Sequence, residues 1–156
     1  AMALACDPKV LLADEPTTAL DVMVQAQILE LLMQLTDDLG LAMIMVTHDL
    51  PLVSQVCTRA AVMYAGEIAE IGKTHDLYHE PLHPYTRMLF SATPDLLAEQ
   101  AVRSIPGAPP RLDQPLVGCP FQPRCDSALT VCASEAAPLR TGTDGHRAYC
   151  HIKDTV

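Results

Sequence analysis

Two short apolar segments with an amphipathic segment between them constrain the fold of this chain most strongly. The first segment is "VLLA" at Val10–Ala13 and the second is "LAMIMV" at residues 41–46. Both are apolar without interruption, as expected for strands covered on both faces. The intervening segment, Val22–Leu39, has apolar residues at helical spacing: Val24, Ile28, Leu31 and Leu35. Two strands joined by a crossover this long predict a parallel βαβ unit.

Local signals mark where further elements begin and end. Asp21 is a favourable N-cap for the helix and Gly40 a favourable stop after it. A short helix is expected at residues 50–56. The stretch "RAAVMYAGEIAEIG" predicts two strands joined by a turn at Gly66, and "AMALAC" at the start is typical of a helix end.

Composition changes after about residue 80, where prolines become dense. We expect a small helix from Pro84 to about Ala92, followed by an irregular segment in which a regular layered sheet is excluded. The chain is therefore predicted to be an α/β protein in two parts. Residues 1–80 contain the βαβ unit, and residues 81–156 form a Pro-rich and Cys-rich extension.

The charge of the chain excludes one class of partner. There are 10 Lys and Arg against 19 Asp and Glu, a net charge of −9. Nucleic-acid binding requires clustered cations, so we do not expect nucleic acid as a partner. The longest fully apolar runs fall far short of the ~20 residues of a membrane-spanning helix. The start of the chain also lacks the pattern of a signal peptide, and its lack of an initial Met suggests a piece of a longer protein.

Acidic residues follow the first predicted strand directly, at Asp14 and Glu15, and His48 follows the second. The carboxyl ends of parallel strands meet at one edge of a sheet, where α/β proteins bind ligands. In a phosphate-handling site, one acid holds Mg²⁺ and a neighbouring acid orients or polarises the attacking water. A His at this edge has the reach to hydrogen-bond a terminal phosphate. Each residue alone has a simpler interpretation, as a solvated strand end.

The order and spacing of "LLADEP", "ALD" and "VTHD" resemble the Walker B strand, D-loop and switch histidine of ATP-binding cassette (ABC) ATPases. The resemblance implies that Asp14 is the Mg²⁺ ligand, Glu15 the catalytic carboxylate and His48 the γ-phosphate switch. It implies that Asp21 contacts nucleotide across a dimer of ATPase subunits. Asp21 alternatively serves only as the helix N-cap.

A phosphate loop is missing from this sequence. "GEIAEIGKT" ends in Gly-Lys-Thr, but five residues separate Gly66 from Gly72 where the loop requires four, and the stretch alternates like a strand. The family's signature motif is missing as well. The resemblance therefore implies the C-terminal half of a longer ATPase, inactive when alone.

The second half resembles the C-terminal extension of oligopeptide and dipeptide importer ATPases, through "HPYTRMLFSATP", "IPGAPPRL" and "GCPFQPRC". It contains four of the six cysteines, Cys119, Cys125, Cys132 and Cys150. The gaps between them are looser than the pairs two to four residues apart that zinc sites favour. They fit thiolate ligation of an iron–sulfur cluster better. The resemblance implies a [4Fe–4S] cluster; zinc, and free or oxidised thiols, are the alternatives. His146 and His151 flank Cys150 and are interpreted as surface residues, with a role as alternative metal ligands left open.

The resemblance implies an ATP- and Mg²⁺-dependent subunit of an importer for peptides or similar small solutes. It would lie on the cytoplasmic face of the membrane. Its partners would be a second ATPase subunit, two membrane-spanning permease subunits and an external solute-binding protein. Two alternatives stay open. One is a soluble ABC ATPase without a transport role, and the other is an inactive, metal-binding interaction module.

Overall fold

The computed structural model describes residues 2–92 and 104–152. It divides into two compact units, residues 1–56 and residues 57–156. The boundary after residue 80 that composition suggests falls inside the second unit, and the division into an ATPase part and an extension stays a prediction. In the described ranges, no helix is long and apolar enough to cross a membrane.

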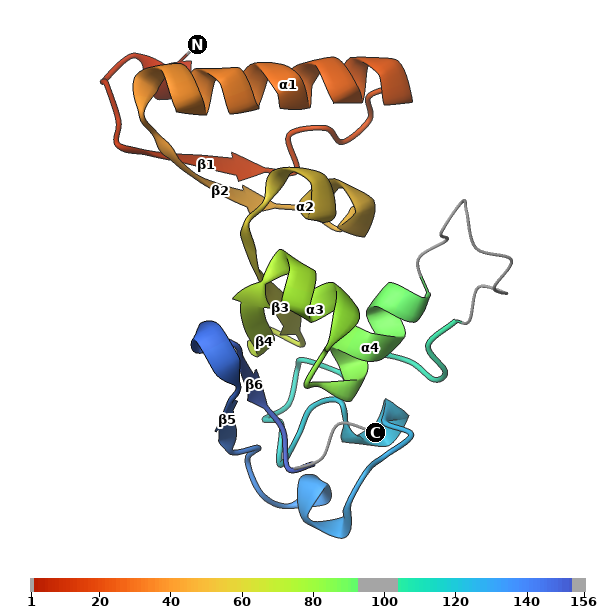
Figure 1. Cartoon of the computed structure of the whole chain (residues 1–156). Helices are drawn as coiled ribbons and strands as arrows, with labels where there is room; N and C mark the ends of the chain where they lie inside the picture. Colours follow the sequence, from red (N-terminus) through yellow and green to blue (C-terminus); the bar gives the residue numbers. More distant parts are fainter. Residues whose placement is uncertain (1, 93–103, 153–156) are drawn as a thin grey trace. The chain divides into compact units, whose positions relative to one another are not determined.

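The first unit is the predicted βαβ unit (Figure 1). Strand β1 (Val10–Asp14) pairs in parallel with β2 (Ala42–Val46), and the register places Asp14 opposite Val46. Helix α1 (Val22–Leu39) connects them, and α2 (Leu50–Val56) follows β2. The fold class, an α/β core with parallel strands, is confirmed.

The ends of α1 agree with the sequence signals. The Asp21 side chain accepts hydrogen bonds from the N–H groups of Met23 and Val24, at 3.1 and 3.0 Å. Gly40 ends the helix with φ 62°, a left-handed conformation that costs glycine little. The chain therefore turns back into β2 directly after the helix.

Two expectations for the first unit are wrong within these residues. Alternate residues of β1 are buried and exposed, with Leu12 at 65% exposure, so one face of the strand is open. The start of the chain forms a short 3-10 turn, Met2–Leu4, where a helix end was expected.

The second unit is built on an antiparallel sheet in the order β3-β4-β6-β5. Strands β3 (Arg59–Tyr64) and β4 (Glu67–Lys73) form the predicted hairpin, with a bulge between Val62 and Met63. Strands β5 (Leu139–Thr141) and β6 (Arg147–Tyr149) come from the Pro-rich half. A regular layered sheet was excluded for this half, and it contributes only these two three-residue strands to the sheet. Strand β6 pairs with β4 through Glu70–Ala148 and Ile71–Arg147.

Short helices complete the second unit: α3 (Thr74–His79) and α4 (Pro84–Ser91), with 3-10 turns at Gln122–Arg124, Thr130–Ala133 and Thr143–Gly145. Residues 66–73, the stretch that ends like a phosphate loop, run through the hairpin turn and β4, so the strand interpretation is confirmed. The core centres on Tyr64, Ala69 and Phe121. Three rings pack there with centroids 4.7–5.2 Å apart, those of Tyr64, Tyr85 and Phe121.

Candidate functional site

Glu15 and His48 meet at the carboxyl edge of β1 and β2. The backbone N–H of Glu15 donates to the carbonyl of Val46 at 2.8 Å, which extends the parallel pairing by one step. His48 lies two residues beyond Val46, and its Nδ1 is 3.0 Å from Oε1 of Glu15. The strand register thus brings together two residues that are 33 positions apart.

The turn after β1 holds the Glu15 carboxylate in place. Glu15 has φ 44°, an uncommon conformation for a residue with a side chain. The hydroxyl of Thr18 donates to its Oε2 at 2.7 Å. The hydrogen bond from Thr18, followed by that with His48, lowers the pKa of Glu15 below its ordinary value. Glu15 is therefore ionised and positioned, with its side chain 44% exposed and open to a ligand.

The other two predicted acids of the first unit have different surroundings. Asp14 ends β1 with an exposed side chain. A single exposed carboxylate suits Mg²⁺, which commonly keeps several waters and binds few protein oxygens. Asp21 caps α1 through two N–H groups, so the structure supports its capping role directly.

Asp49 belongs to this edge but was not predicted. Its Oδ1 accepts the N–H of Leu52 and so caps α2, and its Oδ2 accepts Nε2 of Gln25 from α1 at 3.0 Å. These contacts hold the residue after His48 against α1. The capping role of Asp49 was predictable, because Asp is a favoured residue before a helix. Its contact with Gln25, 24 positions away, has no signal in the sequence.

The four cysteines of the extension lie in the second unit. Cys119 precedes the 3-10 turn Gln122–Arg124 and Cys125 ends it, while Cys132 lies in Thr130–Ala133 and Cys150 follows β6. The N–H of Cys119 donates to the carbonyl of Cys132 at 2.8 Å. All six cysteines of the chain are free thiols.

The electrostatics of these thiols show that they are neighbours. Burial raises the pKa of the Cys119 thiol, and Cys132 and Cys150 raise it further. The pKa of Cys125 is raised by burial first, with contributions from Asp126, Cys150 and Cys119. The pKa of Cys150 is raised by burial and by Cys132. The thiols of Cys119, Cys125 and Cys150 therefore each lie within electrostatic range of another cysteine of this set.

Backbone N–H groups oppose part of this effect. The N–H groups of Phe121 and Gln122 lower the pKa of Cys119. The N–H of Ser127 lowers the pKa of Cys125, and the N–H of Ile152 lowers that of Cys150. Hydrogen bonds to sulfur are one of the means by which proteins tune thiolate-ligated clusters. Within residues 2–92 and 104–152, however, no three His, Cys, Asp or Glu side chains are grouped to hold a metal ion. The donor set fits a thiolate centre in chemistry, but the sulfurs do not converge.

The histidines near Cys150 have separate roles. His146 is 5% exposed, and its Nε2 is 2.6 Å from Oε1 of Glu70. The interpretation of His146 as a surface residue is therefore wrong: a buried carboxylate from β4 stabilises it inside the unit. His151 contacts the carbonyl of Glu135 at 3.1 Å.

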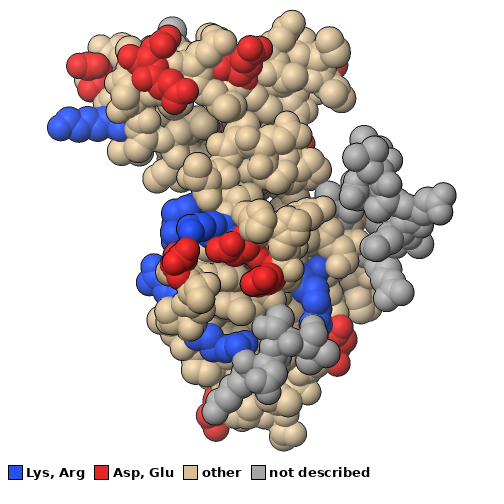
Figure 2. Space-filling view, viewed as in Figure 1, with Lys and Arg blue, Asp and Glu red and all other residues tan. Residues whose placement is uncertain are grey.

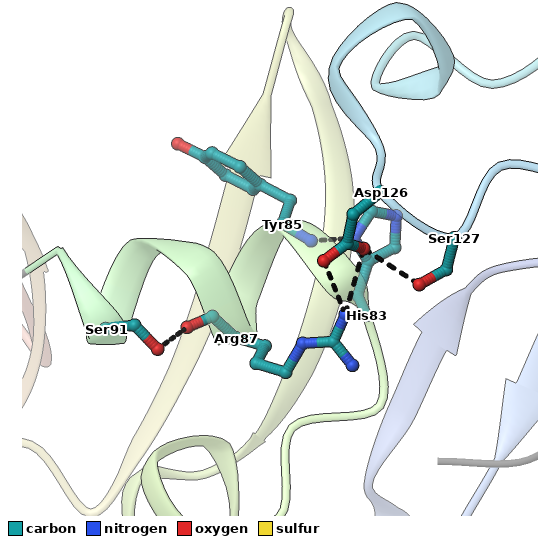
Figure 3. Close-up of polar contacts among 6 residues, drawn as sticks. All are labelled: His83, Tyr85, Arg87, Ser91, Asp126 and Ser127. Carbon is teal, nitrogen blue, oxygen red and sulfur yellow. Dashed lines mark hydrogen bonds and ion pairs between the residues drawn. The ribbon is translucent and has the colours of Figure 1, made fainter. Parts of the chain in front are cut away.

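Helix α4 is tied to the Cys125 segment by an ion pair (Figure 3). Nη2 of Arg87 lies 3.0 and 3.3 Å from the two carboxylate oxygens of Asp126, next to Cys125. The hydroxyl of Ser127 donates to the same carboxylate. This contact fixes the position of the residue after one candidate metal ligand.

Residues 69–132 match a family described as "Oligopeptide/dipeptide transporter, C-terminal region". Whole-chain similarity extends to several curated proteins. A probable peptide ABC transporter ATP-binding protein, y4tR, from Sinorhizobium fredii is 49% identical over 100% of this chain and 47% of its own length. The oligopeptide transport ATP-binding protein OppD from Escherichia coli is 50% identical over 96% of this chain and 44% of its own.

The dipeptide transport ATP-binding protein DppD from Bacillus subtilis is 46% identical over 99% of this chain and 46% of its own length. The chain thus spans about half the length of the curated relatives it matches. A solved structure, cbiO1 from Clostridium perfringens, described as part of the ABC transporter complex cbiONQ, is 36% identical. It covers 47% of this chain and 30% of its own, with a TM-score of 0.44, too low to establish a shared fold.

Proposed function

We propose that the complete protein hydrolyses ATP to power import of peptides or similar small solutes. The basis is that the chain belongs to the family of ATP-binding subunits of oligopeptide and dipeptide transporters. The observation that carries the proposal is the 3.0 Å contact between Glu15 and His48 at the ends of parallel strands. A carboxylate and an imidazole held together at this edge suit the activation of water beside a phosphate.

Each site residue has a proposed role that follows from its surroundings. Glu15, ionised and fixed by Thr18 and His48, orients the attacking water and accepts its proton. His48, 80% exposed at its side chain, donates toward the terminal phosphate. Asp14 would hold Mg²⁺ bound with ATP, and the metal would neutralise charge on the phosphates. Asp21 is proposed to reach nucleotide across a subunit dimer, in addition to capping α1.

The four cysteines are proposed to hold a [4Fe–4S] cluster, with zinc as the alternative. Their mutual electrostatic influence and the N–H groups directed at three of them support a thiolate centre. Because the thiols do not converge in the structure, binding would draw the segments around Cys119, Cys125, Cys132 and Cys150 together. The centre would be structural or redox-sensing and take no part in ATP chemistry.

The proposed setting is the cytoplasmic face of the cell membrane. A second ATPase subunit, identical or different, two permease subunits and an external solute-binding protein would complete the transporter. Similarity to peptide transport subunits favours this role over a soluble ABC ATPase or an inactive interaction module.

Uptake by the complete transporter tests the proposal. The test uses membrane vesicles that hold the full-length subunit with its permease partners. Glu15→Gln should retain ATP binding, and its ATP turnover should fall by at least about 100-fold, the lower end of the rate acceleration that a general base provides. Peptide uptake should fall in parallel. Glu30→Gln, an exposed acid of α1, is the matched control and should leave both rates unchanged. Normal uptake by the Glu15 variant would refute the assigned role.

The 156-residue chain alone should not hydrolyse ATP. It lacks the backbone cradle and lysine of a phosphate loop. Residues 1–56 also have eight Asp and Glu against a single basic residue, Lys9, and acids dominate this unit in Figure 2. Phosphate release by the purified chain, with Glu15→Gln as the blank, measures this. Turnover that depends on Glu15 would contradict the expectation.

A further inference from the structure

The second unit contains a cavity of about 560 Å³, formed by residues of this unit alone. Its walls are mainly apolar, formed by Ile68, Ala69, Leu116, Phe121 and Ala137 among others. A mostly apolar cavity of several hundred Å³ with a few polar groups is the usual form of a small-molecule site. Of the four cysteines, Cys119 alone lines it, so most of the cavity lies apart from the proposed thiolate centre.

His83 supplies a polar group in this wall that the proposed ATPase chemistry does not use. The side chain is 4% exposed, and its Nδ1 accepts the N–H of Tyr85 at 3.0 Å, at the start of α4 (Figure 3). Burial lowers the pKa of His83 to about 4, so the ring is neutral near pH 7. Because Nδ1 accepts, the ring proton is on Nε2.

The Nε2–H of His83 has no hydrogen-bond partner among residues 2–92 and 104–152. A donor in the cavity wall that no described protein group satisfies is available to an acceptor that enters the cavity. Three further residues with polar groups line the cavity, Tyr64, Glu67 and Tyr149. Lys and Arg are absent from the lining that the structure describes, so an anionic ligand would have no counter-charge there and would face the Glu67 carboxylate.

We propose that this cavity binds a small neutral or cationic molecule with an apolar body and an uncharged amide carbonyl, which accepts a hydrogen bond from Nε2–H of His83. Short apolar peptides and amino-acid amides are the corresponding class. The apolar wall takes the side chain and His83 sets its orientation. Glu67 at the cavity disfavours free carboxylates and favours an ammonium group. The site requires neither ATP nor a membrane partner.

Calorimetric titration of the 156-residue chain with N-acetyl-L-leucine amide tests the proposal. N-acetyl-L-leucine, which differs by its anionic carboxylate, is the matched probe and should bind about tenfold more weakly or not at all, the scale of one lost favourable interaction. L-leucine amide, which carries an ammonium group, should bind at least as tightly as the neutral probe. Glu67→Gln should reduce this discrimination, and Glu80→Gln, an exposed acid outside the cavity, should not.

Two variants locate the site. His83→Asn retains an acceptor at the N-cap of α4 but replaces the ring Nε2–H with a shorter amide group, and should weaken amide binding about tenfold. Ala137→Leu fills the cavity from a half-buried position and should abolish binding. Thermal melting of each variant checks its fold.

Two results would overturn the proposal. One is the absence of amide binding by a folded chain, and the other is binding that both variants leave unchanged. Because the titration contains no nucleotide and no permease, either result would leave the proposed ATPase role standing. Conversely, failure of peptide uptake would leave this site standing.

Discussion

Glu15 shows how one residue combines strand geometry with a local turn. Its N–H continues the β1–β2 pairing while φ 44° turns the chain away, and this directs the carboxylate toward His48 and Thr18. The adjacent acids were predicted from sequence, and their placement at one edge with His48 followed from the parallel register. The supporting hydroxyl of Thr18 was missed, since a Thr in a turn has many roles.

Removing the Thr18 hydroxyl should raise the pKa of Glu15 toward its ordinary value, because that hydrogen bond is the largest cause of the lowering. The pKa rises because the hydrogen bonds from Thr18 and His48 favour the ionised carboxylate, and the variant lacks the first of them. Carboxyl NMR titration of Thr18→Val against the unmodified chain measures the shift. Thr36→Val, whose hydroxyl donates to a backbone carbonyl within α1, serves as the control. An unchanged Glu15 titration would contradict the assignment.

His83 should make the second unit less stable in acid. With a folded pKa of about 4 against the ordinary 6.5, the unfolded chain binds a proton between these values and the folded chain does not. Stability therefore falls as pH decreases through this window, by about 2 kcal/mol between pH 7 and pH 5 from this group. Urea unfolding of the chain and of His83→Asn at both pH values should show a smaller loss in the variant. Equal losses would refute the burial argument.

Strand β4 is the element on which the second unit depends, through the side chain of Glu70. This carboxylate is fully buried and accepts N–H groups from Leu82 and His83 at 2.7 and 2.9 Å, and Nε2 of His146 at 2.6 Å. It thus joins β4 to the start of α4 and to the turn before β6. Gly72 makes room for the His146 ring, since a Cβ there would lie 2.8 Å from its Cδ2.

Glu70→Gln should destabilise this unit by about 2–4 kcal/mol, because the amide NH₂ would face N–H donors in a fully buried site. Glu67→Gln on the same strand, exposed and outside this network, should change the free energy of unfolding by less than about 0.5 kcal/mol. Urea unfolding gives both values, and amide exchange at Arg147 and Ala148 reports the β4–β6 pairing. Similar stability of the two variants would contradict the network's importance.

At the scale of the whole molecule, prediction succeeded where local signals were strong. The bounds of α1 were predicted to the residue because Asp21 and Gly40 are cap residues at the two ends of an amphipathic period. Strands β5 and β6 have three residues each, too few for a period, and β6 pairs with β4 across the Pro-rich residues 81–138. The burial of His146 depends on Glu70, 76 positions away, and no sequence pattern around either residue predicts their contact.

The two units should differ in stability within this chain, and the first should unfold at lower urea. Four described residues of the first unit are buried, Leu11, Ala13, Thr17 and Leu52, and α1 contributes none. Leu12, Ile44 and Val46 on its strands are 65%, 57% and 49% exposed, so the sheet buries little apolar surface to offset its conformational entropy. The second unit has an aromatic core and the Glu70 network.

Hydrogen exchange followed by mass spectrometry measures this difference, with peptides from β1, α1 and β2 exchanging faster than those from β3 and β4. Residues 57–156 expressed alone should keep the exchange pattern that they show in the full chain. Equal protection of both units in the 156-residue chain would refute the expected difference in stability.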